Sequence, residues 1–154
     1  METNVLTKEE SIPVLGYPGL NLARALPMNI LLAEDNEVTQ KIIVYLLTRM
    51  EYTIELVENG IKVLEAIEKK KYDLILMDVQ MPLMDGIETT RRIRAKYKEN
   101  EQPKIIALTA NDIHEVQRLC TDAGMDDYMQ KPMHLFLVFN IIRKWGEIIV
   151  SRRN

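Results

Sequence analysis

The chain has 154 residues, of which 47% are hydrophobic and 28% charged, and its formal net charge is −3 at pH 7. This composition is typical of one globular domain, and the mild acidity argues against broad binding to nucleic acid. Cys120 is the only cysteine, which excludes a disulfide within the chain and a thiolate metal cluster. The sequence has neither an apolar run of roughly 20 residues nor a signal peptide. We therefore expect a soluble, cytoplasmic protein.

Residues 1–27 differ in composition from the rest of the chain. They contain three prolines and two glycines, and their apolar residues follow neither a helical nor an alternating period. We expect this stretch to be a flexible linker or arm. A domain over residues 28–150 and a short tail over 151–154 are expected to follow.

From residue 28 onward, short apolar runs alternate with stretches of helical period. Five runs predict strands, and the three that are continuously apolar are typical of strands buried on both faces of a parallel sheet. The runs are residues 30–33, 53–57, 74–77, 105–108 and 128–129. Alternation of strands and helices predicts an α/β fold, with an open five-stranded parallel sheet and helices on both of its faces.

Apolar residues three or four apart predict a helix after each strand. Asn36 is expected to cap the first of these helices, and Asp85, with Glu88 three residues later, is expected to cap another. The expected core stripe of the first helix is Val38, Ile42, Leu46 and Met50. The expected core stripe of the last helix is Val138, Ile141, Ile142, Trp145, Ile148 and Ile149.

Polar side chains follow the strands at their carboxyl ends, where ligand sites lie in open α/β sheets. Glu34 and Asp35 follow the first strand and Asp78 ends the third. Thr109 ends the fourth strand, and Lys131 follows the fifth. Three carboxylates held close together require a divalent cation or protonation, and an all-oxygen set favours Mg²⁺ or Mn²⁺. A carboxylate beside such a cation can also attack a phosphoryl group.

Each of these residues alone has an ordinary structural explanation. An acidic pair after a strand often begins a helix, where the helix dipole favours negative charge, and a single Asp at a strand end is often a turn residue. The set is more specific than its members, because all five residues are expected at one edge of one sheet.

Four segments, in this order, resemble the receiver domain of two-component response regulators, most of all the receivers of hybrid histidine kinases. The segments are LLAEDN (31–36), MDVQMPLMDG (77–86), ALTA (107–110) and AGMDDYMQKP (123–132). The resemblance covers about residues 28–150. It implies a flavodoxin-like (CheY-like) fold with strand order 2-1-3-4-5.

The resemblance also implies roles for the acidic residues. Asp78 would be the phosphoacceptor, which takes a phosphoryl group from a phosphohistidine. Glu34 and Asp35 would bind Mg²⁺ or Mn²⁺, together with Asp78 and the backbone carbonyl of Gln80. The positions of Gln80 and Asn111 are those that tune the lifetime of the acyl phosphate in this family.

Further roles are implied around the phosphate. Thr109 and Lys131 would contact the bound phosphoryl group, and the ring of Tyr128 would turn inward when Thr109 is drawn to it. The peptide bond between Lys131 and Pro132 is expected to be cis. Phosphorylation would act by shifting the population of the domain toward an active conformation.

The implied partners are a histidine kinase or a histidine phosphotransfer protein, with no direct contact to nucleic acid and none to a membrane by the domain itself. On the last helix, a rotation of 100° per residue places Phe136 and Phe139 away from the expected core stripe. They are either part of a partner or homodimer surface, or scattered apolar surface.

Two other functions stay open beside that of a regulatory phosphoacceptor without a separate substrate. A Mg²⁺-dependent phosphohydrolase also uses an Asp nucleophile, but it usually has a second Asp two residues on, where this chain has Gln80. A receiver-like interaction module that works without phosphorylation is the other alternative, and the intact five-residue set argues against it. The domain is expected either alone or as the receiver part of a hybrid histidine kinase.

Overall fold

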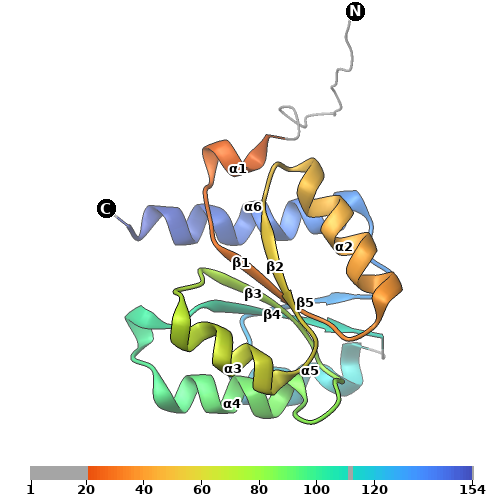
Figure 1. Ribbon diagram of the computed structural model, residues 1–154, viewed down its shortest axis with the longest axis vertical. Helices are drawn as coiled ribbons and strands as arrows, with labels where there is room; N and C mark the ends of the chain where they lie inside the picture. Colours follow the sequence, from red (N-terminus) through yellow and green to blue (C-terminus); the bar gives the residue numbers. More distant parts are fainter. Residues whose placement is uncertain (1–20, 111–112, 154) are drawn as a thin grey trace, which may run out of the picture.

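The computed structural model describes residues 21–110 and 113–153, which form a five-stranded parallel sheet with helices on both faces (Figure 1). The sheet has the order β2-β1-β3-β4-β5. Its strands are β1 (Ile30–Ala33), β2 (Ile54–Val57), β3 (Leu74–Asp78), β4 (Lys104–Thr109) and β5 (Asp127–Gln130). The predicted fold class and strand order are confirmed.

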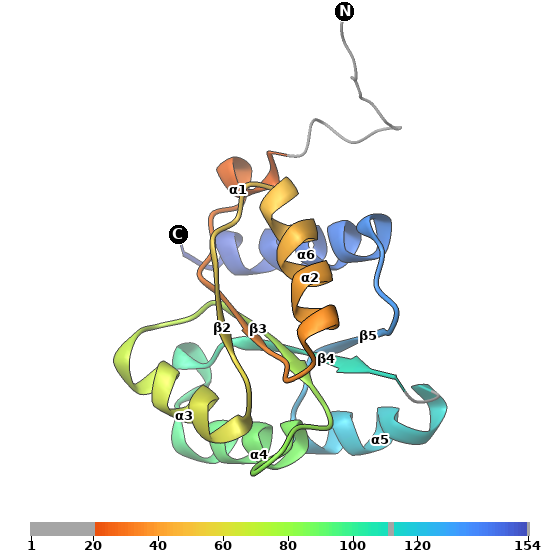
Figure 2. The same cartoon turned by 45° about the vertical axis from the view of Figure 1, so that its right-hand side comes forward.

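Helices cover the two faces of the sheet in two groups. The helices α2 (Glu37–Arg49) and α6 (Leu135–Ser151) lie on one face (Figure 1, Figure 2). The helices on the other face are α3 (Gly60–Lys69), α4 (Gly86–Lys96) and α5 (Ile113–Ala123). A short helix α1 (Leu22–Ala25) precedes β1, and a 3-10 turn (Glu99–Glu101) precedes β4. None of the helices within the described part of the chain is long and apolar enough to cross a membrane.

The central strands divide their side chains between two apolar clusters. In β1, Ile30 and Leu32 pack into the cluster beneath α2 and α6, whereas Leu31 and Ala33 pack into the cluster beneath the other three helices. Successive side chains of a strand point to opposite faces, so a strand covered on both sides must be apolar throughout. The edge strand β2 is covered less completely, and its Leu56 is 42% exposed.

The two predicted helix caps are present. The Asn36 side chain accepts a hydrogen bond from the Thr39 N–H at 2.9 Å, and the Asp85 side chain accepts one from the Glu88 N–H at 2.8 Å. Both caps lie just beyond the carboxyl end of a strand. They therefore fix the starts of α2 and α4 at the edge of the sheet where the acidic residues gather.

The expected core stripe of α2 is wrong for its first two members. Val38 is 67% exposed and Ile42 is 41% exposed. The buried face of the helix is formed by Ile43, Leu46 and Leu47. Each four-residue step turns about 40° beyond a full turn, so a strict four-residue spacing drifts off any one face of a helix.

The segment before β1 packs onto the domain. Leu22 is buried in the cluster beneath α2 and α6. The Ala23 N–H donates to the Met50 carbonyl at 3.0 Å, and the Tyr52 hydroxyl donates to the Leu26 carbonyl at 2.6 Å. These bonds fasten the segment to the end of α2.

The sequence predicts a linker over residues 1–27, but within this stretch the structure has the short helix α1. Propensity and pattern fail here because a four-residue helix has too few residues to show a period, and tertiary contacts hold it instead. Gly146 of α6 makes room for the segment, since a Cβ at Gly146 would lie 3.0 Å from Leu26 Cδ1. Residues 1–20 lie outside the described residues.

Leu22→Ala should lower the free energy of unfolding by about 2 kcal/mol, because it removes buried apolar volume that α2 and α6 enclose. Leu56→Ala is the matched control, since its half-exposed side chain should cost less than about 1 kcal/mol. Chemical denaturation of both variants measures the difference. Equal losses in the two variants would contradict the packing of α1 onto the core.

Candidate functional site

Three carboxylates meet at the carboxyl edge of the sheet. Ala33 of β1 pairs with Met77 of β3, so the residues that follow them, Glu34 and Asp78, reach the same level. Oxygen atoms of Glu34, Asp35 and Asp78 all lie within 4.8 Å of one another. The neighbouring strands thus bring together the acidic residues that the sequence predicts at this edge.

Glu34 is the most buried member of the cluster, with 0% of its surface exposed. Its Oε2 accepts a hydrogen bond from the Asn36 N–H at 3.1 Å. Its Oε1 lies 2.8 Å from Lys131 Nζ in an ion pair, but accepts no hydrogen bond of good geometry among the described residues. Apart from this ion pair, the oxygen has room for a further partner, and it can therefore also serve a cation.

Lys131 bridges the two buried carboxylates. Its Nζ is 2.8 Å from Glu34 Oε1 and 3.3 Å from Asp78 Oδ1. Burial alone would lower the pKa of Lys131, but its contacts with Glu34 and Asp78 outweigh burial, and the pKa is raised. The ammonium group is thus held charged between the carboxylates, and the bond from Lys131 to Pro132 is cis, as predicted.

Asp78 has an environment that opposes its ionisation. Burial and the negative charge of Glu34 raise the pKa of Asp78 to about 7, although Lys131 acts in the opposite direction. The Gln80 N–H donates to Asp78 Oδ1 at 3.3 Å. A cation beside Asp78 would favour its charged form, which is the form that attacks phosphorus.

A small hollow lies directly beside Asp78. Its volume is about 70 Å³. Its lining residues are Asp78, Val79, Gln80, Thr109, Ala110 and Lys131. A cavity needs roughly 10–15 Å³ to hold one water, so the hollow has room for a group of the size of a phosphoryl.

The segment that follows Asp78 requires a glycine at position 86, where α4 begins. A Cβ at Gly86 would lie 2.3 Å from the Asp78 carbonyl oxygen. The Gly86 N–H donates to the Val79 carbonyl at 2.9 Å. Only glycine lets the start of α4 approach β3 this closely, and this close approach cannot be seen in the sequence alone.

The remaining predicted residues differ in burial. Thr109, the last residue of β4, is 2% exposed, and Tyr128, the second residue of β5, is 37% exposed. Phe136 is 60% exposed, but Phe139 is only 2% exposed and belongs to the core. The prediction of Phe139 as part of a partner surface is therefore wrong. Asn111 lies outside the described residues.

The error at Phe139 comes from the direction that α6 faces. The buried residues of α6 are Val138, Phe139, Ile142 and Gly146. Periodicity defines an apolar stripe, but the helix is apolar around much of its circumference, so the sequence does not decide which side meets the sheet. Packing against β1, β3 and α1 decides it.

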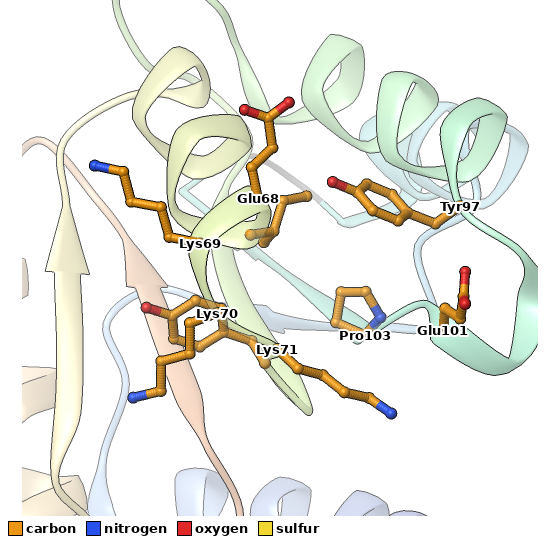
Figure 3. Close-up of a pocket in the computed structure, with 9 residues that line it drawn as sticks. Glu68, Lys69, Lys70, Lys71, Tyr97, Glu101 and Pro103 are labelled. Carbon is orange, nitrogen blue, oxygen red and sulfur yellow. The ribbon is translucent and has the colours of Figure 1, made fainter.

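A larger hollow lies elsewhere, with a volume of about 420 Å³ (Figure 3). It lies between the ends of α3 and α4, beside Tyr72 and Pro103, which precede β3 and β4 at the opposite edge of the sheet. Figure 3 shows the ammonium ends of Lys69, Lys70 and Lys71 pointing in different directions. The three ammonium groups do not converge in this hollow, and the acidic edge is the candidate functional site.

The acidic cluster fits a hard divalent cation. Its donors are all carboxylate oxygens, and Glu34 and Asp78 are buried while Asp35 is exposed. Oxygen donors suit Mg²⁺, which keeps several waters, and the exposed side of the cluster leaves room for them. Glu34 Oε1, which accepts no hydrogen bond of good geometry among the described residues, agrees with this assignment.

Comparison with known proteins identifies the family. The sequence model of the response regulator receiver domain matches residues 30–143. The chain belongs to this family and is a receiver domain of two-component phosphorelay signalling. The resemblance predicted from the four segments is confirmed.

Relatives with similar sequences are much longer proteins. Hybrid signal transduction histidine kinase E of Dictyostelium discoideum is 38% identical over 121 residues, which cover 77% of this chain and 7% of that protein. Histidine protein kinase 1 of Candida albicans is 37% identical over 157 residues, which cover 95% of this chain and 6% of that protein. The chain thus spans a small part of the length of these kinases.

Solved structures include two receivers with the same fold. The receiver domain of a sensor histidine kinase from Pseudomonas aeruginosa, with a magnesium ion coordinated in its active site cleft, is 40% identical and has a TM-score of 0.71. The match covers 78% of this chain and 98% of that one. The receiver of Saccharomyces cerevisiae Ssk1, solved with the histidine phosphotransfer protein Ypd1, is 30% identical with a TM-score of 0.70, and the match covers 77% and 88%.

Asp78→Asn should stabilise the magnesium-free domain at pH 8 and lose this advantage toward pH 4. The pKa of Asp78 is about 7 in the folded state, above its ordinary value of about 3.9. The protonated carboxyl therefore contributes stability that is full below about pH 4 and is lost as the pH rises through about 7. Asparagine stays neutral throughout, and the difference has an upper bound of about 4 kcal/mol.

Denaturation midpoints of the wild type and Asp78→Asn, measured across this pH range without Mg²⁺, give the difference directly. Asp122→Asn, at an exposed position of α5, is the matched control. A gap between wild type and Asp78→Asn that does not change with pH would contradict the raised pKa.

Proposed function

We propose that Asp78 accepts a phosphoryl group from a phosphohistidine and that the domain thereby shifts to an active conformation. The observation that carries this proposal is the hollow of about 70 Å³, which joins Asp78, Thr109 and Lys131 beside the three carboxylates. Membership of the receiver family supports the same function. The hollow brings together the Asp78 carboxylate, which can attack phosphorus, the Lys131 ammonium group, and room for a phosphoryl group.

Transfer is a displacement at phosphorus. A carboxylate oxygen of Asp78 forms the new O–P bond while the P–N bond of the phosphohistidine breaks, and the imidazole leaves with the electron pair and takes up a proton. Lys131 Nζ, which is 3.3 Å from Asp78 Oδ1, is placed to bind an oxygen of the phosphoryl group. The Thr109 hydroxyl serves another oxygen from the end of β4.

Mg²⁺, or Mn²⁺ in its place, would be held by Glu34, Asp35, Asp78 and the backbone carbonyl of Gln80. When bound, the cation offsets the negative charge that gathers on the phosphoryl oxygens during transfer. The magnesium ion in the similar Pseudomonas aeruginosa receiver supports this choice of metal.

The conformational response would begin at Thr109. This side chain is buried beside the hollow, whereas Tyr128 on the neighbouring strand β5 is 37% exposed. When the Thr109 hydroxyl moves toward the phosphoryl group, the ring of Tyr128 can turn inward. Phosphorylation adds only about one negative charge here, so new hydrogen bonds and packing do most of the switching.

The partner of the reaction would be a histidine kinase or a histidine phosphotransfer protein. The complex of Ypd1 with the similar Ssk1 receiver supports the second class, and the kinases among the relatives support the first. The domain would turn over no separate substrate and would act in the cytoplasm. It would act either alone or as the receiver part of a hybrid histidine kinase.

Incubation with acetyl phosphate and Mg²⁺ should add about 80 Da, the mass of one phosphoryl group, to the wild type. Intact-mass measurement checks this, with Asp78→Asn and a magnesium-free sample as controls that should gain nothing. An adduct of equal yield on Asp78→Asn would contradict the assignment of the phosphoacceptor. An adduct that forms equally well without Mg²⁺ would contradict the role of the cation.

Phe136 alone remains of the proposed partner or homodimer surface on α6, because Phe139 is buried. If two copies associate through this helix, the sedimentation coefficient of the wild type should rise with concentration, and that of Phe136→Asp should not. A charged side chain at the centre of an apolar contact opposes association. Identical monomeric behaviour of both proteins would remove the homodimer.

A further inference from the structure

The backbone carbonyl of Glu34 belongs to the peptide unit that joins two of the three acidic residues. On one side of this unit, the Glu34 N–H donates to the Val57 carbonyl at 3.0 Å and continues the pairing of β1 with β2. The Glu34 carbonyl accepts from a side chain instead, because Gln40 Nε2 donates to it at 2.6 Å. Gln40 belongs to α2, so a helix holds the backbone just beyond the end of β1.

Gln40 is itself firmly held at the start of α2. Its backbone N–H donates to the Asn36 carbonyl at 2.9 Å, and the Asn36 side chain caps the helix by accepting from the Thr39 N–H. Gln40 is also half-buried. A short hydrogen bond from a half-buried amide on a capped helix leaves the Glu34 carbonyl little freedom to rotate.

The orientation of this peptide unit restricts where two carboxylates can lie. A peptide unit is planar, so the carbonyl and the α-carbons of Glu34 and Asp35 share one plane. Fixing the carbonyl therefore restricts the directions in which both side chains leave the backbone. The Glu34 side chain has further support from the Asn36 N–H and from Lys131, whereas Asp35 is exposed.

Repulsion between the carboxylates works against the cluster. Oxygen atoms of Glu34, Asp35 and Asp78 lie within 4.8 Å of one another, and like charges at this distance repel. If the backbone were free to rotate, the exposed Asp35 could turn into water and relieve the repulsion, and the cation would lose a ligand. Removing a group that holds a metal ligand in place typically weakens metal binding by roughly 10- to 100-fold.

We infer that Gln40 is a positioning residue for the cation site, because its amide holds the Glu34–Asp35 peptide in the orientation that brings both carboxylates to Asp78. Gln40 acts through the backbone carbonyl of Glu34 and is not itself a ligand. The inference rests on the proposed function and specifies what sets the affinity of the same site for its cation.

Two variants remove the hydrogen bond in different ways. Gln40→Met keeps the length of the side chain but has no donor, and Gln40→Asn keeps the amide on a side chain one methylene shorter. Gln102→Met is the matched control, because the half-buried Gln102 donates through Nε2 to the Tyr97 carbonyl at the same distance of 2.6 Å. Gln102 precedes β4, at the opposite edge of the sheet. All three variants should lower the denaturation midpoint, but only those at Gln40 should alter cation binding.

The dissociation constant of Mn²⁺ is measured from the electron paramagnetic resonance signal of the free ion. Both Gln40 variants should bind Mn²⁺ about tenfold more weakly than the wild type, a change of about 1.4 kcal/mol, and Gln102→Met should bind it as the wild type does. With acetyl phosphate, the Mg²⁺ concentration for half-maximal labelling of the Gln40 variants should rise by a similar factor. Their labelling rate at saturating Mg²⁺ should change much less.

Wild-type affinity for Mn²⁺ in both Gln40 variants would overturn the inference, as would an equal loss of affinity in Gln102→Met. So would a wild type without measurable affinity for Mn²⁺, or a slower rate at saturating Mg²⁺ with no change in the half-maximal concentration. A wild type that binds Mn²⁺ but takes no phosphoryl group from acetyl phosphate would instead count against the proposed function, while the Mn²⁺ affinities still decide the inference.

Discussion

Repulsion between buried carboxylates is the constraint on which the site depends. Glu34 is completely buried, and Asp78 nearly so, within reach of the same ammonium group. A buried charge without a partner costs several kcal/mol, so neither carboxylate is stable there as an isolated anion. Lys131 compensates one negative charge and leaves a remainder, while burial and the charge of Glu34 raise the pKa of Asp78. A divalent cation would offset that remainder, so the same electrostatics that destabilise the edge favour a cation there.

The sheet supplies the rigidity that this arrangement needs. The residues of the site begin where the strands end, and the hydrogen bonds between the strands continue one step beyond them. Glu34 N–H donates to the Val57 carbonyl at 3.0 Å, and Lys131 N–H donates to the Thr109 carbonyl at 2.7 Å. Because the backbone is held in this way, the side chains are the main groups of the site that can move. Under the proposed function, phosphorylation would then act on the orientation of a few side chains, among them Thr109 and Tyr128.

The sequence predicts whatever depends on local rules, which here includes the five site residues and the caps at Asn36 and Asp85. Continuous apolar strands and polar residues at their ends are sufficient to specify a parallel sheet and its active edge. The face that a helix buries depends on its neighbours instead, and both errors are of this kind. Phe139 is buried and Val38 is exposed because of how α6 and α2 lie on the sheet. The short α1 exists only through contacts with residues distant in sequence, so no local pattern reveals it.

Two non-glycine residues with a positive φ occur in the described part of the chain, and they differ in origin. Glu51, with φ 71°, follows α2, where Glu51 N–H donates to the Thr48 carbonyl and Tyr52 N–H to the Leu47 carbonyl. This is the usual left-handed end of a helix, and the side chain of Glu51 pairs with Arg24 at 3.0 Å. Leu83 ends no helix, and its exposed side chain gains little from the fold. The same backbone conformation therefore has two origins in the described residues: a helix end at Glu51, and at Leu83 a tight turn that the Met84 N–H closes by donating to the Pro82 carbonyl at 2.7 Å.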